Sequence, residues 1–155
     1  MVYEPEEGNY LEEAIEELKR VDHLIFVSLK YTRTVDVLKN VLKRLITTFG
    51  CVIDGVLGDA RDEKKIMEVP LAPVKKCSAL KELIPGKYDE LIDFFLYLRK
   101  LDRAEYDKIN EFRRHVALIA HTEDEGDVEV SIDVVTEYYR KATTLIEALT
   151  KKPED

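Results

Sequence analysis

Apolar residues recur at every third or fourth position along most of the chain, which places them on one face of an α-helix. The first such stripe comprises Leu11, Ile15, Leu18 and Leu29. A second stripe runs from Val35 to Val56, and residues 31–34 interrupt the period between the two stripes. The pattern therefore predicts two helices with a break near Tyr31. Asn9 supplies a helix-capping side chain at the start of the first helix.

The middle of the chain has the pattern of a loop followed by a short helix. Pro70 and Pro73 lie in the segment MEVPLAPV, and prolines at this spacing favour a loop. Leu80 and Leu83 follow at helical spacing, and the Pro-Gly pair at residues 85–86 ends that period. A short helix is therefore expected between the loop and the Pro-Gly turn.

A third long stripe begins near Tyr88. It comprises Leu91, Phe94, Leu98, Leu101, Ile109, Phe112, Val116 and Ile119. This period predicts one continuous helix from Tyr88 to about His121, which the acidic turn HTEDEGD closes. Ser131 or Asp133 can cap a final helix, whose apolar face comprises Val134, Tyr138, Leu145 and Leu149.

No segment shows the strict alternation of apolar and polar residues that indicates a half-buried strand. The segment Asp127–Val130 (DVEV) is the nearest approach, and it is long enough to extend for a few residues only. We therefore predict an all-α fold, an antiparallel up-down bundle of four long helices plus one short helix. With 155 residues the chain is expected to form a single domain, residues 1–155, with its core at about residues 10–150.

The charge balance limits what the surface can bind. There are 32 acidic and 24 Lys or Arg residues, which gives a net charge of -8. A mostly negative surface repels phosphates, so any nucleic-acid contact must depend on a local basic patch. The charged fraction of 36% is typical of heat-adapted intracellular proteins.

Other classes of protein are disfavoured by what the sequence does not contain. No apolar run approaches the roughly 18 residues that a membrane span requires, and the acidic N-terminus does not resemble a signal peptide. We therefore expect a soluble, cytoplasmic protein with no membrane partner. Cys51 and Cys77 lie too far apart to suggest a metal site, so neither a metal nor another cofactor is expected.

The segment EFRRHVALIAH, Glu111–His121, places unusual chemistry inside the third stripe. On a helix Arg114 and His121 would lie about 20° apart, nearly opposite the core stripe, with His115 nearer its edge. Seven residues also span about 10 Å of helix axis, so one chain cannot easily bring both side chains to one phosphate. A two-fold axis near Ala117 would pair Arg114 with His121 of a second copy, which predicts a homodimer with a composite site.

The sequence RHVALIAH, with Arg114, His115 and His121, resembles the motif of the HEPN superfamily of helical bundles: Arg, a polar residue, several further residues, then His. The resemblance implies metal-independent RNA cleavage by a dimer. His121 would act as general acid or base, Arg114 would hold the phosphate, and His115 would orient Arg114 or the substrate. Glu123 stands where members that act with a nucleotidyltransferase often carry Tyr, so tyrosine modification is not expected there.

Two further interpretations remain open. Many HEPN proteins are non-catalytic, so the chain is alternatively an interaction module, for example the partner of a nucleotidyltransferase in a toxin–antitoxin-like pair. The third interpretation is a bundle whose Arg–His spacing is accidental and whose Arg114 and His121 are ordinary surface residues. The acidic turn beside the motif disfavours RNA unless the strand approaches from the side of Arg103 and Arg113.

Overall fold

Helices form most of the chain over residues 9–150, the range that this computed structural model describes. The helices are α1 (Asn9–His23), the π-helix η1 (Leu24–Ser28), α2 (Leu29–Tyr31), α3 (Val35–Asp62), α4 (Pro73–Leu83), α5 (Asp89–Arg103) and α6 (Ile132–Thr150). Three strands lie between α5 and α6: β1 (Glu105–Ile109), β2 (Ala117–Thr122) and β3 (Gly126–Ser131). The predicted domain of residues 1–155 extends at both ends into residues outside the described range.

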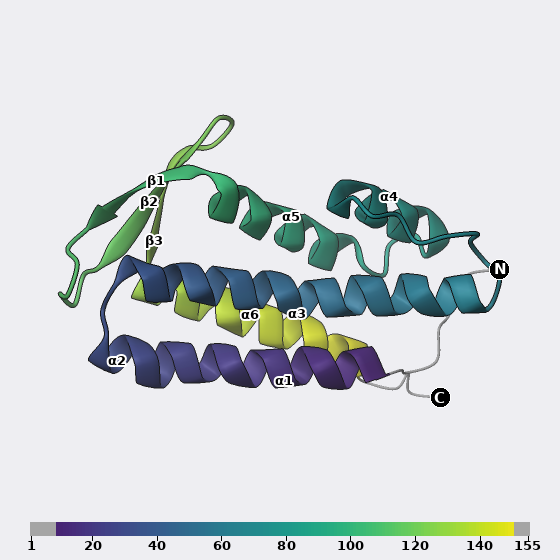
Figure 1. The fold of residues 1–155 in the computed structure, drawn as a ribbon, viewed down its shortest axis with the longest axis horizontal. Helices are drawn as coiled ribbons and strands as arrows, with labels where there is room; N and C mark the ends of the chain where they lie inside the picture. The colour runs from purple at the N-terminus through teal and green to yellow at the C-terminus, as the bar shows by residue number, and fades with distance from the viewer. Residues whose placement is uncertain (1–8, 151–155) are drawn as a thin grey trace.

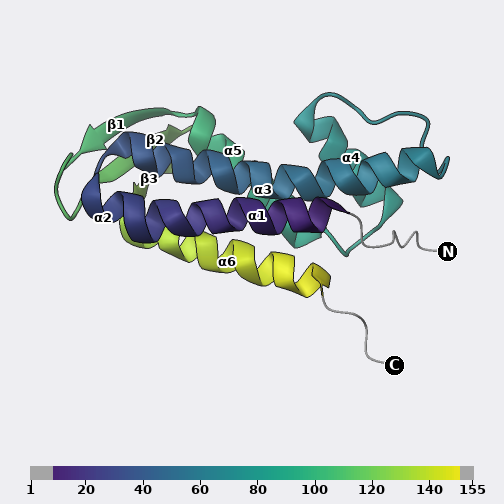
Figure 2. The same cartoon turned by 60° about the horizontal axis from the view of Figure 1, so that its bottom comes forward.

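The central helix α3 carries the core. Its fully buried side chains recur at helical spacing and include Leu38, Leu42, Leu45, Phe49, Ile53 and Leu57. Helix α1 runs alongside α3, while α5 and α6 pack against other sides of it (Figures 1 and 2). The predicted break at residues 31–34, the predicted short helix and the predicted final helix are all confirmed.

Gly55 allows α1 and α3 to approach closely. A Cβ atom built at Gly55 would overlap the ring of Tyr10, which is buried against this point of α3. A glycine in the middle of a helix usually costs about 0.5–1 kcal/mol relative to Ala. At Gly55 the absence of a side chain allows the ring of Tyr10 to lie directly on the backbone of α3.

The predicted all-α bundle is wrong, because the third long helix ends at Arg103 and the chain continues as an antiparallel sheet in the order β1-β2-β3. The apolar residues from Ile109 to Ile119 fit a helical period, but burial along β2 alternates from Leu118 onward. Leu118 and Ala120 are fully buried, whereas Ile119 between them is half-buried and His121 is exposed. Alternation of this kind is the signature of a strand with one face on the core.

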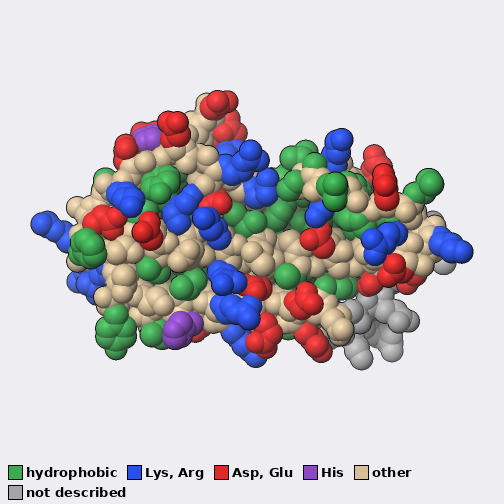
Figure 3. All heavy atoms as spheres, viewed as in Figure 1, with side chains coloured by type: hydrophobic (Ala, Val, Ile, Leu, Met, Phe, Trp, Pro, Cys, Tyr) green, Lys and Arg blue, Asp and Glu red, His purple; other side chains and the backbone are tan. Residues whose placement is uncertain are grey.

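The register of the sheet separates an inner from an outer face. Leu118 pairs with Val130 and both side chains pack on the helical core. The outer face carries Glu105, Asp107, His121, Asp127 and Glu129. Acidic side chains accordingly gather over the sheet, at the end of the molecule opposite α4 (Figures 1 and 3). We call the end of the sheet where residues 110–116 join β1 to β2 the loop end, and the end where residues 123–125 join β2 to β3 the turn end.

Candidate functional site

The sheet separates the three residues of the predicted motif. Arg114 and His115 lie at the loop end, whereas His121 lies on β2 near the turn end. Six residues of extended strand span about 20 Å, so the two groups occupy different sites of one chain. The predicted dimer axis also fails, because Ala117 and Leu118 are fully buried under this chain's own helices. A homodimer of another geometry stays a prediction.

At the turn end, His121 is held between two carboxylates from the neighbouring strands. Its Nδ1 lies 2.7 Å from Oδ1 of Asp127 on β3, and its Nε2 lies 2.9 Å from Oδ2 of Asp107 on β1. The hydrogen bond with Asp127, followed by that with Asp107, raises the pKa of His121 above its ordinary value of 6.5. A protonated imidazole donates at both nitrogens, so this arrangement favours a role in tying the three strands together.

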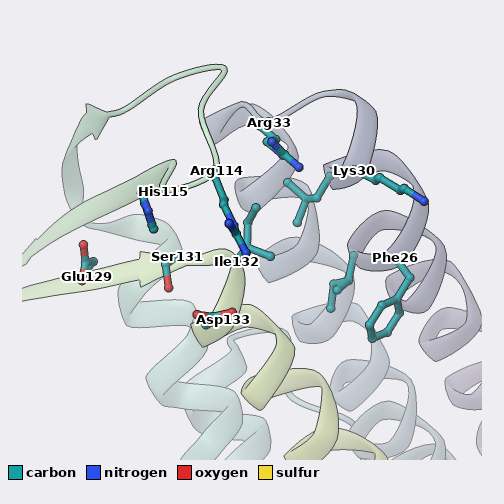
Figure 4. A pocket seen from close by; sticks show the side chains of 11 residues that line it. Phe26, Lys30, Arg33, Arg114, His115, Glu129, Ser131, Ile132 and Asp133 are labelled. Atoms are coloured by element: carbon teal, nitrogen blue, oxygen red, sulfur yellow. The ribbon is translucent and has the colours of Figure 1, made fainter.

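At the loop end, an open cleft of about 610 Å³ lies between the η1–α2 segment, the β1–β2 loop and the start of α6. Its lining comprises the basic residues Lys30, Arg33, Arg114 and His115, the acidic residues Glu129 and Asp133, and Ile25, Phe26, Leu29, Ser131 and Ile132. Two of the three predicted site residues, Arg114 and His115, therefore lie in one cleft. Figure 4 shows Arg33 above Arg114, which points toward Ile132, while Lys30 points away from both.

Two hydrogen bonds dock the β1–β2 loop on the turn between α2 and α3 and so bring Arg114 near Arg33. The N–H of Phe112 donates to the carbonyl oxygen of Arg33 at 2.7 Å. The N–H of Val35 donates to Oε2 of Glu111 at 3.1 Å. The carboxylate thus accepts from a backbone N–H group in the first turn of α3 that has no partner within the helix. An acidic group is favoured at a helix N-terminus. The contact therefore holds the β1–β2 loop against the start of α3.

The docked loop has a strained backbone. Asn110 and Phe112 both adopt left-handed backbone conformations, with φ angles of 54° and 65°. Asn tolerates this region of backbone conformation, but a bulky aromatic residue rarely adopts it. The Asn110 amide also donates to the carbonyl oxygen of His115 at 3.3 Å, which braces the loop internally. Strain of this kind concentrates at functional sites.

The wall of the cleft opposite the loop contains a π-helix and one exposed aromatic side chain, that of Phe26. Residues 24–28 form the π-helix η1, and such segments occur frequently at functional sites. Phe26, which lines the cleft, is 51% exposed, whereas Tyr31 at the end of α2 is 78% exposed but is not among the residues that line the cleft. A ligand with an aromatic or apolar part would find a surface for it here.

The electrostatics of the cleft favour an anion. Within residues 9–150, Lys30, Arg33 and Arg114 form no ion pair, although the acidic surface offers many carboxylates. Ser131 caps α6, since its Oγ accepts from the N–H of Val134 at 3.2 Å, and the positive end of this long helix faces the cleft. Asp133 in the first turn offsets part of that positive charge.

A second cleft, of about 820 Å³, lies beside the turn end but has fewer free cations. Lys100 pairs there with Asp124 at 2.7 Å, and this hydrogen bond raises the pKa of Lys100 and lowers that of Asp124. Arg103 lines this cleft, whereas Arg113 is not among the residues that line either one. Over the described part of the chain, no three His, Cys, Asp or Glu side chains are arranged to hold a metal ion.

The sequence did not identify Lys30 and Arg33 as site residues. The available signal was the break it predicted near Tyr31, since basic residues at a helix break are often exposed and free to bind. What the sequence could not show is that the segment around Arg114 folds back onto this break.

No family model, curated protein or solved structure matches the chain. The resemblance to the HEPN superfamily therefore stays a prediction, and the helical placement of its motif is wrong because Arg114 lies in a loop and His121 in a strand. Among the described helices, none has both the length and the apolar character needed to cross a bilayer.

Proposed function

We propose that the protein is a cytoplasmic RNA- or nucleotide-binding protein that holds a phosphate group in the cleft at the loop end. One observation carries the proposal. Arg33 and Arg114 line the same cleft without an ion pair among the described residues, beside the N-terminus of α6. Unpaired cations that line an open cleft are suited to an anionic ligand.

The chemistry of the lining fits a phosphate attached to a base. Guanidinium groups bind phosphate oxygens through two parallel hydrogen bonds, and Arg33 and Arg114 supply two such groups. The positive end of α6 adds attraction for the same anion. Phe26 in the lining offers an exposed ring on which a base can stack. The net charge of -8 repels nucleic acid from the rest of the surface, so binding is restricted to this cleft.

Metal-independent RNA cleavage is a second candidate, and the position of His115 favours it. His115 lines the cleft together with Arg114, while His121 does not. In this proposal the imidazole of His115 takes the proton from a ribose 2′-hydroxyl, which attacks the adjacent phosphorus. The P–O bond to the 5′ oxygen breaks, the 5′ oxygen takes a proton from water, and a 2′,3′-cyclic phosphate is left. Arg114 stabilises the charge that develops on the phosphoryl oxygens.

A binding titration with a matched pair of variants tests the first proposal. Fluorescently labelled single-stranded RNA and a labelled nucleotide are titrated with protein in the presence of a chelator. Arg114→Gln is expected to weaken binding by about 10-fold or more, since a hydrogen bond to a charged group contributes about 1.5–3 kcal/mol. Arg113→Gln removes the same charge from the neighbouring residue outside the cleft, and it is expected to change binding much less.

The same samples test cleavage. Loss of chelator-resistant cleavage in His115→Ala, with activity retained in His121→Ala, supports the second proposal. The opposite result would restore the catalytic role that the sequence predicts for His121. If the wild-type protein binds neither RNA nor nucleotide, both proposals fail and the non-catalytic interaction module, including a nucleotidyltransferase partner, becomes the better interpretation.

A further inference from the structure

The segment between α3 and α4 exposes large apolar side chains at the end of the molecule opposite the sheet (Figures 1 and 3). Met67 is 98% exposed and Leu71 is 94% exposed, while Val74, in the first turn of α4, is 63% exposed. Single exposed apolar residues are common on protein surfaces. Three within eight residues, two of them almost entirely in solvent, indicate a contact surface.

The fold presents these side chains outward while it anchors their neighbours. Ile66 and Val69 in the same segment pack against the hydrophobic core. Met67 and Leu71 lie on either side of Val69, so inward and outward side chains succeed one another along the segment. The exposed apolar side chains are therefore held in place by the segment's own anchors.

Lysines flank the apolar segment on both sides. The sequence KKIMEVPLAPVKK, residues 64–76, contains four lysines and one glutamate, which gives a local net charge of 4 − 1 = +3 in a chain of net charge -8. Lys64, Lys65 and Lys75 are exposed and form no ion pair within residues 9–150, while Lys76 pairs with Asp54 at 2.7 Å.

Lys64 occupies a backbone position that favours glycine. Its φ angle is 62°, and the N–H groups of Lys64 and Lys65 donate to the carbonyl oxygens of Arg61 and Ala60 at 3.0 and 2.8 Å. These are the hydrogen bonds of a Schellman motif, which usually has Gly at the left-handed residue. The dipole of α3 favours a cation at the C-terminal end of the helix. Lys64 supplies this cation at the residue where the apolar segment begins.

We propose that residues 64–76 form a peripheral membrane-contact element that inserts Met67 and Leu71 into the surface of an anionic bilayer. Lys64, Lys65 and Lys75 then lie at the depth of the lipid headgroups. Interfacial binding combines buried apolar area with attraction of basic residues to anionic lipids, and this segment supplies both. The sequence predicts no membrane partner because it has no membrane-spanning run and no signal-peptide pattern. Neither observation concerns an element that binds the bilayer surface without crossing it.

A bilayer fits this surface better than a protein partner does. Stable protein interfaces bury about 800 Å² on each partner and require a broad complementary surface, whereas two projecting side chains offer little area. A fluid bilayer accepts projecting side chains without shape complementarity. The element lies far from the cleft at the loop end (Figure 1), so its test does not depend on the proposed ligand of that cleft.

The absence of Trp from the sequence permits a direct test. Met67→Trp places a single indole at the tip of the segment, and Tyr31→Trp places one at an exposed position near the sheet. Each full-length variant is mixed with phosphatidylcholine vesicles that either contain or lack phosphatidylserine. The proposal predicts a blue shift of the Met67→Trp emission with phosphatidylserine vesicles only, which salt reverses, and no shift for Tyr31→Trp.

Co-sedimentation with the same vesicles measures the affinity. Replacing Leu71 by Asp is expected to weaken binding about 10-fold or more, since a buried Leu contributes about 1.5–3 kcal/mol and 1.4 kcal/mol is a factor of ten. Tyr31→Asp, the same kind of change at the other end, leaves binding unchanged. Thermal melting checks that both variants are folded. Equal binding to neutral and anionic vesicles, no binding of the wild-type protein, or an equal loss in both variants overturns the proposal.

Discussion

At the turn end of the sheet His121 lies between two carboxylates that bind it, whereas at the loop end Arg114 has no ion-pair partner among the described residues. The backbone differs in the same sense. The turn end places Gly126 at its left-handed position, with φ at 68°, while the loop end places Phe112 there. Satisfied charges and relaxed turns stabilise a fold, but unpaired charge and strain require another reason. The difference identifies the loop end as the part of the sheet suited to a ligand.

The largest expected effect is on ligand binding at the loop end. Arg33→Glu combined with Arg114→Glu is expected to weaken binding of RNA or nucleotide by at least 100-fold, because two charge-assisted contacts contribute about 3 kcal/mol or more together. His121→Gln at the turn end is the control. Fluorescence anisotropy measures both, and a comparable loss in the control would remove the distinction between the two ends.

The second largest effect is expected on stability, at the β2–β3 turn that contains Gly126. Gly126→Ala is expected to lower the free energy of unfolding by about 1–2 kcal/mol, because an L-residue pays that cost in the left-handed region. A Cβ at Gly126 meets no atom within 4 Å, so the backbone conformation alone sets the cost. Urea denaturation measures it, and an unchanged midpoint would show that the turn readily adopts another conformation.

A substitution in the strained β1–β2 loop is expected to raise the free energy of unfolding instead of lowering it. Phe112→Gly releases backbone strain but gives the unfolded chain more freedom, so we expect a net stabilisation of about 0.5–1 kcal/mol. Phe112 is largely exposed, so little buried contact is lost. The same denaturation experiment compares it with Gly126→Ala. Destabilisation by both variants would mean that the Phe112 side chain stabilises the loop end.

The smallest effect is the pH dependence of stability at the turn end. Since folding raises the pKa of His121, its contribution is fully present below the unfolded value of about 6.5 and is lost as the pH rises through the folded value. The groups are exposed, so the contribution is small. Melting temperatures of the wild-type protein should fall more between pH 6 and pH 8 than those of His121→Gln, and parallel curves would contradict this.

Helices that bury a continuous stripe were predicted well from sequence, because the period of α3 is unambiguous over its whole length. The segment from β1 to β3 was not, because its apolar positions satisfy two periods at once. Ile109, Val116 and Ile119 lie at helical spacing, while Leu118 and Ala120 alternate with the less buried Ile119 and the exposed His121. No glycine or proline marks the β1–β2 loop, so the usual signal of a hairpin is missing.

The sequence predicted part of the candidate site, namely the residues that lie within one segment of the chain. Arg114 and His115 attracted attention as unusual residues inside an apolar run, and both line the cleft. Arg33 belongs to a distant segment and reaches the cleft only through the backbone contact between Phe112 and Arg33. Such a contact between layers of the fold leaves no local pattern, so only the structure reveals it.

The central claim is that Arg33 and Arg114 together bind a phosphate group. A crystal structure of the protein with a bound nucleotide tests it most directly. The account predicts a phosphate between the two guanidinium groups, at hydrogen-bonding distance from both and beside the start of α6. A nucleotide bound instead near His121 at the turn end, with the cleft at the loop end empty, would contradict it.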